Sequence, residues 1–212
     1  MRGLDGILVN VIMQTVKKEI SSKDYDGIEQ QLQDHGMRVT DMFYRFPEMK
    51  KSLLHFTNEL KIIEDKVLKN FLVIEQDPET SEIWLVIKNQ NMTELILKSF
   101  ADEEKKAIMD LIRDTPETIP KILERCRIPN TSGYRKMNQL IDEKMVVTTG
   151  LAETFEGKRA ILYKSIIQKM QILINANEIT ARILVDRETL DSSEIIRTIT
   201  EINQNKTKTV TN

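Results

Sequence analysis

The chain has 212 residues, of which 40% are hydrophobic and 30% are charged, and its formal net charge is −2. This length suffices for two small domains with cores, and the weak net charge excludes a uniformly basic nucleic-acid coat protein. The single cysteine, Cys126, excludes an internal disulfide and paired-thiolate zinc sites, which indicates a reducing compartment. The apolar stretch at residues 7–13 is too short for a signal peptide or a membrane span. We therefore expect a cytoplasmic protein without a membrane segment.

Residues 1–100 predict a helical domain that ends in a β-hairpin. Apolar residues recur at helical spacing over 4–20, 24–36, 39–46 and 53–68. Pro47 is expected to break or restart the third of these helices. Two runs rich in Val and Ile, 71–75 and 82–88, flank a turn-forming segment and indicate a hairpin that carries Trp84. A short further helix completes this domain, for which we expect a role in dimerisation or signal input.

Residues 101–203 predict a second domain, and residues 204–212 a flexible polar tail. Its first part consists of helices at 101–112, 118–126 and 130–143 and of strands at 146–149 and 160–163. A second hairpin at 166–185 and a final helix that begins with a capping signal at 191–194 are expected to extend this domain. The sequence thus predicts an α+β fold in which two domains follow one another along the chain.

The helix at 130–143 has the composition of a DNA-reading helix. Asn130 and Ser132 are expected to cap its start, and Tyr134, Met137, Leu140 and Ile141 are expected to face the core. The opposite face carries donors suited to phosphates or base edges, and the loop after the next strand holds Gly157-Lys158-Arg159. The candidate DNA-binding residues are Thr131, Ser132, Arg135, Lys136, Gln139, Lys158 and Arg159.

Charge distribution agrees with a DNA-binding role. Between residues 119 and 169 there are ten basic and five acidic side chains, although the whole chain is slightly acidic. Basic groups lie on the turn between the second and third helices, on the exposed face of the third helix and on the loop between the strands. The alternative is an ordinary solvated charged surface.

Helix, helix, turn, helix, strand, basic loop and strand is the order of a winged helix-turn-helix. The phrases Gly133-Tyr134-Arg135-Lys136-Met137 and Leu140-Ile141-Asp142-Glu143-Lys144-Met145-Val146 resemble the recognition helix and first wing strand of ArsR-like regulators, particularly archaeal ones. The chain departs from that pattern at Lys144, where those proteins usually have glycine. The resemblance covers residues 101–165 and implies a transcriptional regulator that binds double-stranded DNA. The alternative is a winged-helix adaptor that binds a protein partner of the transcription machinery.

We predict a homodimer, because one winged helix reads too few base pairs for useful specificity. The long apolar stripe of the first helix could be internal core or a dimer seam. The seam residues would be Leu4, Ile7, Leu8, Val11 and Ile12, or Ile195 and Ile199 in the final helix.

No pattern indicates catalysis, a metal or a cofactor. His35 and His55 stand alone, and no phosphate loop, nucleophile elbow or two-carboxylate arrangement is present in the sequence. The aromatic group Phe43, Tyr44, Phe46 and Phe56 is interpreted as core, with a small-molecule pocket as the alternative. We therefore expect no enzyme, no cofactor and no metal, and leave open a small-molecule or protein effector at the N-terminal domain.

Overall fold

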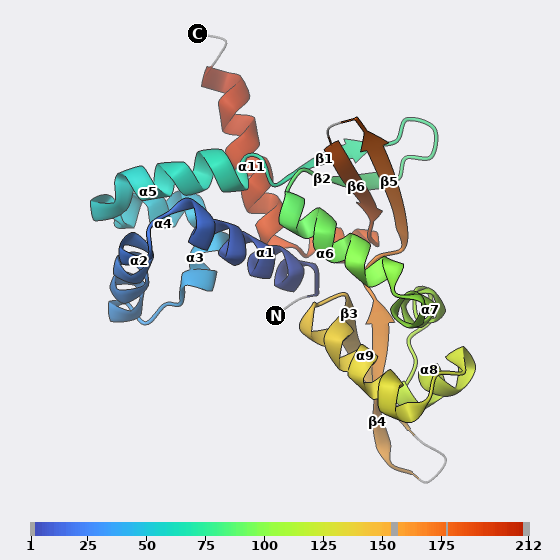
Figure 1. Cartoon of the computed structure of the whole chain (residues 1–212). Coiled ribbons are helices and arrows are strands. Elements are labelled where there is room, and N and C mark those ends of the chain that lie inside the picture. Colours follow the sequence, from blue (N-terminus) through green and yellow to red (C-terminus); the bar gives the residue numbers. More distant parts are fainter. Residues whose placement is uncertain (1–2, 154–156, 177, 210–212) are drawn as a thin grey trace.

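A computed structural model describes residues 3–153, 157–176 and 178–209, and it has an α+β fold, as the sequence predicts (Figure 1). The N-terminal helices are α1 (Gly3–Glu19), α2 (Ser22–Asp34), α3 (Val39–Tyr44), α4 (Phe46–Ser52) and α5 (Thr57–Ile62), with the short turn η1 (Leu54–Phe56) before α5 and the π-helical segment η2 (Ile63–Leu68) after it. Local chemistry accounts for their ends. The Ser21 side chain caps α2, Gly36 follows it with φ of 70°, and Pro47 lies in the first turn of α4. The break predicted at Pro47 is confirmed.

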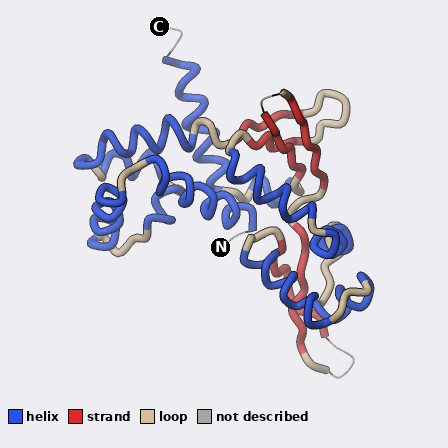
Figure 2. The backbone as a smooth tube through the Cα atoms, viewed as in Figure 1, coloured by secondary structure: helices blue, strands red, loops and turns tan. Residues whose placement is uncertain are grey.

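Four strands form one antiparallel sheet in the order β1–β2–β6–β5 (Figure 2). They are β1 (Leu72–Gln76), β2 (Ile83–Ile87), β5 (Lys169–Asn175) and β6 (Glu178–Leu184). Leu85 lies opposite Ile183 and Ile87 opposite Ala181, so apolar side chains share one face of the sheet. The helix α6 (Gln90–Ala101), capped by the Asn89 side chain, packs on β2 and β6.

The position of the C-terminal hairpin corrects the expected domain organisation. We expected the β5–β6 hairpin to extend the second domain, but β6 pairs with β2 of the N-terminal half. The sequence of a hairpin specifies its turn and the register between its two strands. Which further strand the hairpin pairs with depends on which sheet edge the rest of the fold leaves unpaired. The segment between α6 and β5 is therefore an insertion between two parts of one structural unit.

The last helix closes this unit. After the short α10 (Arg187–Asp191), α11 (Glu194–Thr209) packs on α1 and α3. Buried Asp5 of α1 accepts hydrogen bonds from the Ser193 hydroxyl and from the backbone N–H groups of Glu194, at 3.2 Å, and Ile195, at 3.4 Å. A carboxylate from the start of the chain thus satisfies the free N–H groups at the start of α11.

The two candidate dimer seams are wrong as seams. The side chains proposed for them are at most 2% exposed within a single chain: Leu4, Ile7, Leu8, Val11, Ile12, Ile195 and Ile199. The two stripes belong to one core, because α1 and α11 pack on each other. The tail expected to be flexible from residue 204 is helical to Thr209, and residues 210–212 lie outside the described residues.

The inserted segment contains the elements predicted for it. They are α7 (Glu103–Leu111), α8 (Ile119–Cys126), α9 (Asn130–Asp142), β3 (Val146–Glu153) and β4 (Arg159–Ser165), and we call residues 103–165 the helix–hairpin module. The three helices pack on one another through Ile108, Leu123 and Met137, and β3 and β4 form a separate antiparallel pair. Glu117, just before α8, exchanges two backbone hydrogen bonds with Tyr163 of β4, at 3.0 and 2.9 Å.

In the part of the chain that the structure describes, no helix is both long enough and apolar enough to cross a lipid bilayer.

Candidate nucleic-acid interface

The turn into α9 is built by the backbone rather than by the predicted side-chain caps. Arg127 adopts a left-handed conformation with φ of 56°, and the N–H of Ile128 donates back to the Leu123 carbonyl at 2.9 Å. Pro129 occupies the N-cap position, and no side chain caps the helix. The expected capping by Asn130 and Ser132 is therefore wrong, because the prolyl residue already ends the turn one position earlier.

The core-facing side of α9 contains Gly133, Met137 and Leu140, all buried. A Cβ atom at Gly133 would lie 2.4 Å from Leu123 Cδ2, so the absence of a side chain lets α8 and α9 approach closely. Tyr134, which we expected in the core, is 44% exposed. The predicted core positions Met137 and Leu140 are confirmed, but Gly133 takes the core position assigned to Tyr134, because a stripe of apolar side chains cannot identify a glycine as a core position.

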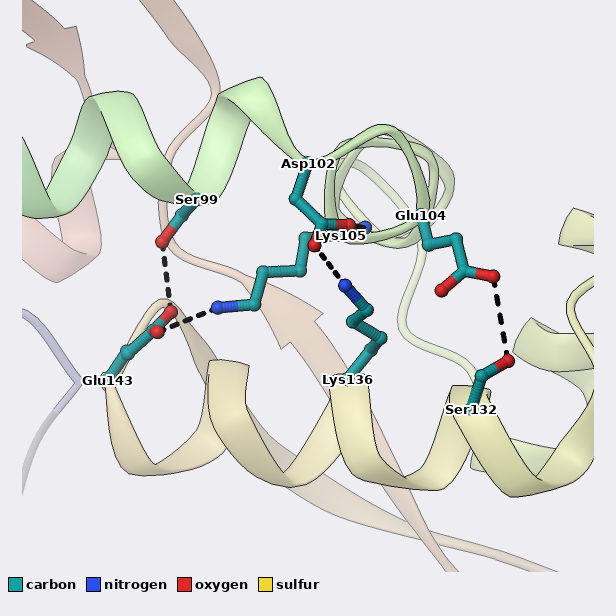
Figure 3. Close-up of polar contacts among 7 residues, drawn as sticks. All are labelled: Ser99, Asp102, Glu104, Lys105, Ser132, Lys136 and Glu143. Atoms are coloured by element: carbon teal, nitrogen blue, oxygen red, sulfur yellow. Dashed lines mark hydrogen bonds and ion pairs between the residues drawn. The ribbon is translucent and has the colours of Figure 1, made fainter.

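A second side of α9 faces α6 and α7 and is held there by polar contacts (Figure 3). Lys136 forms an ion pair with Asp102, the N-cap residue of α7, and Glu143 lies 2.7 Å from the ammonium group of Lys105. The Ser99 hydroxyl of α6 donates to the same Glu143 carboxylate at 2.9 Å. We call these five residues the α7–α9 clamp.

The clamp corrects the role predicted for Lys136. Its side chain is only 16% exposed and its ammonium group is paired with a carboxylate, so Lys136 is not presented to solvent as a DNA contact. The hydrogen bond from Lys136 holds the pKa of Asp102 below its usual value. Ser132 also turns toward α7, with its hydroxyl 3.5 Å from a Glu104 carboxylate oxygen and 3.2 Å from the Pro129 carbonyl. Two of the predicted contacts therefore face the protein.

The remaining side of α9 is open to solvent. Thr131, Arg135 and Asn138 are exposed at spacings of four and three residues and so form one stripe, with Gln139 exposed beside it. Asn138 is not among the predicted DNA contacts, although its helical spacing from Thr131 and Arg135 places it on the same side of the helix. Exposed Asp142 ends the stripe at the C-terminus of the helix.

Four arginines of the helix–hairpin module are exposed. Arg125 at the end of α8, Arg127 in the turn, Arg135 on α9 and Arg159 at the start of β4 are all exposed. None of these four makes an ion pair with another residue that the structure describes. Lys158 is exposed beside Arg159. Figure 1 shows the β3–β4 hairpin projecting beyond the three helices, at the end of the module where α8 leads into α9.

The projecting hairpin also exposes apolar surface. Leu151 and Ile161 lie directly opposite each other in the β3–β4 pair and are 57% and 46% exposed. A register shift between Thr148 and Gly150 precedes them on β3. Residues 154–156 of the connecting loop lie outside the described residues.

The histidines, the cysteine and the aromatic group considered as catalytic or ligand-binding candidates do not form a site in the described residues. The described residues contain no group of three or more His, Cys, Asp or Glu side chains placed to hold a metal ion. His35 and His55 are exposed, and burial raises the pKa of the Cys126 thiol, which makes it a poor nucleophile. Phe43 and Phe46 are fully buried, so the interpretation of the aromatic group as core is confirmed for them.

Comparison of the chain with protein-family models, with curated proteins and with solved structures yields no match.

Proposed function

We propose that the protein is a DNA-binding transcriptional regulator that contacts double-stranded DNA through its helix–hairpin module, used as a winged helix-turn-helix. The observation that carries this proposal is a set of four exposed arginines in the module, at the end of α8, in the turn, on α9 and at the start of β4, none of which pairs with a carboxylate among the described residues. Arginine without an internal partner retains its full charge for phosphate oxygens and its planar donors for guanine. The lysines of the clamp, Lys105 and Lys136, are by contrast paired with carboxylates and little exposed.

Under this proposal, some residues of the module position it on the DNA backbone, and others contact base edges. Arg125 and Arg127 lie at the turn that leads into α9, where they suit phosphate contacts that fix the helix against the duplex. Arg135 and Asn138 project from the exposed stripe and suit guanine and adenine edges in the major groove. Lys158 and Arg159 suit the backbone or the minor groove beside the reading helix.

The proposal includes a cytoplasmic location and a homodimer, because two copies would double the number of base pairs read. The dimer contact must lie outside the α1 and α11 stripes, since those side chains are buried within one chain.

Fluorescence anisotropy with a labelled mixed-sequence duplex, measured across a salt series, tests DNA binding. Phosphate contacts make the logarithm of the binding constant fall with the logarithm of salt concentration, by about 0.9 per phosphate neutralised. We expect Arg135→Ala to weaken binding by about 1–3 kcal/mol, uniformly over sequences for a phosphate contact or selectively at one base pair for a base contact. The Lys158→Ala, Arg159→Ala double variant should weaken binding to all sequences alike.

Arg197→Ala is the matched control, because Arg197 is an exposed arginine of α11 outside the module. It should bind as the parent protein does. If the parent protein shows no salt-dependent binding, or if Arg135→Ala and the double variant both match the control, DNA reading by these residues is refuted.

A second candidate function is a winged-helix adaptor that binds a protein partner. The exposed pair Leu151–Ile161 favours it, because adjacent apolar side chains on a projecting hairpin suit a protein interface. Leu151→Ser combined with Ile161→Ser should leave DNA affinity unchanged under the DNA-binding proposal. Loss of a partner captured by the parent protein, together with absent DNA binding, would favour the adaptor.

A further inference from the structure

A cavity of about 590 Å³ lies between the helix–hairpin module and the four-stranded sheet. Its walls are the hairpin turn after β1, the start of β5 and the outer side of α7. Its size falls within the range of small-molecule sites, and such sites often form where two structural units meet. Neither the clamp nor the exposed stripe of α9 uses this cavity.

The floor of the cavity is apolar. Trp84, Met109 and Ile167 are each at most 4% exposed overall, and Phe100 and Met170, which are partly buried, line it as well. One indole, one phenyl ring and two methionines form a surface suited to a flat apolar body, since thioethers adapt to the shape that they contact.

The rim carries charges of both signs, and most of them are already paired. Lys106 pairs with Asp110 at 2.5 Å, and Lys169 pairs with Glu82. The remaining acid, Asp77, accepts the backbone N–H groups of Glu79 and Thr80, both at 2.9 Å, within its own turn. These contacts hold five of the six charged side chains on the rim.

The sixth is Arg113 of the segment that follows α7. Its contact is with the adjacent Asp114 at 3.4 Å, and Asp114 is 75% exposed and does not line the cavity. An ion pair of that length with an exposed neighbour binds weakly, so the guanidinium can exchange it for another anion. The cavity therefore offers an apolar floor with one available cation at its edge.

We propose that this cavity binds a small aromatic or aliphatic carboxylate, with the apolar body on Trp84 and Met109 and the carboxylate on Arg113. The proposal goes beyond DNA binding and does not depend on it, because the site is separate from the exposed stripe. It does involve α7, which carries Lys105 and is capped by Asp102, so an occupant would lie against the helix that holds α9 in place.

The test uses Trp84, the only tryptophan of the chain, as an internal reporter. The intact protein is titrated with 4-phenylbutyrate and with its neutral twin, 4-phenylbutyramide, while emission from Trp84 is recorded. We expect a saturable change with the acid and at least tenfold weaker binding of the amide. Arg113→Gln should weaken binding of the acid about tenfold and leave binding of the amide unchanged.

Arg187→Gln is the matched control, because Arg187 is an exposed arginine outside the cavity that forms a similar weak pair with Asp191 at 3.7 Å. It should bind the acid as the parent protein does, and thermal melts should show that both variants fold. Absence of a saturable change with the acid would overturn the proposal. Equal binding of acid and amide, or an Arg113→Gln variant that binds the acid like the parent protein, would overturn the assignment of a carboxylate to Arg113.

Discussion

The two polar sides of α9 have similar residue types in the sequence but different surroundings in the folded protein. The side that carries Lys136 and Glu143 faces α6 and α7 and is closed by ion pairs, whereas the side that carries Arg135 and Asn138 is open to solvent. Lysine and arginine on neighbouring positions of one helix are therefore not equivalent. One holds the helix in its place, and the other is available to a partner.

The difference follows from what each side meets. Lys105 is only 9% exposed at its side chain, so it needs a carboxylate, and Glu143 together with Ser99 supplies the contacts. Nothing in the described structure covers Arg135 in this way. The orientation of α9 is therefore stabilised by charge pairs whose members already have partners within the protein.

The largest effect should come from breaking the clamp at Glu143. Glu143→Ala leaves the ammonium group of Lys105 buried without a partner, and we expect the free energy of unfolding to fall by about 3 kcal/mol. Urea unfolding measures this. Asp142→Ala, at the exposed neighbouring position, should change stability by less than about 0.5 kcal/mol.

The double variant Lys105→Met, Glu143→Leu distinguishes the effect of an unpaired charge from the effect of lost packing. If an unpaired charge causes the loss, removing both charges should restore most of the stability. A double variant as unstable as Glu143→Ala would show that packing of the long side chains, and not the charge, stabilises the contact.

Arg135→Gln and Lys136→Gln separate the two sides of α9 directly, and this prediction rests on the proposed DNA binding. Arg135→Gln should weaken DNA binding about tenfold and leave stability within about 0.5 kcal/mol, because its side chain is exposed. Lys136→Gln should lower stability by about 1 kcal/mol and change DNA affinity at most about twofold. Anisotropy and urea unfolding on the same preparations check both. The reverse pattern would restore Lys136 as a DNA contact.

Asn138→Ala should have a smaller effect, on specificity. An asparagine on the exposed stripe suits a bidentate contact to adenine, so its loss should relax preference at one position by about 1 kcal/mol. Binding to a randomised duplex pool, with selection and sequencing, measures this preference. A uniform loss across the pool would instead indicate a phosphate contact at Asn138.

The smallest effect concerns pH. In the folded protein the pKa of Asp102 lies below its ordinary value of 3.8, chiefly because Lys136 donates to it. A carboxyl group with a lowered pKa contributes stability above 3.8, and this contribution is lost as the pH falls through the folded-state pKa. The stability difference between the parent protein and Asp102→Asn, below about 1 kcal/mol at neutral pH, should therefore shrink toward pH 3. A difference that stays constant with pH would show that the capping geometry alone matters.

Local chemistry in the sequence determined most of the elements. Apolar periodicity located most of the helices and strands, and Pro47 marked the break between α3 and α4. The order of the elements between residues 103 and 165 was predictable from the sequence, whereas the short helix α10 was not. The exposed positions Thr131, Arg135 and Gln139 followed from the same helical spacing. These features depend on neighbours within a few residues, which a sequence displays.

Only the tertiary structure decided which of these elements pack together into one structural unit. The pairing of β6 with β2, the contact of α11 with α1, and the ion pair between Asp102 and Lys136 join residues far apart in the chain. The sequence shows the same apolar stripes on α1 and α11 whether a second copy or the same chain covers them. Removing these side chains from water is favourable in either case, so the pattern does not identify what covers them. A lysine likewise carries one charge in every sequence context, and whether a carboxylate or a phosphate meets it depends on which side of the helix the fold closes.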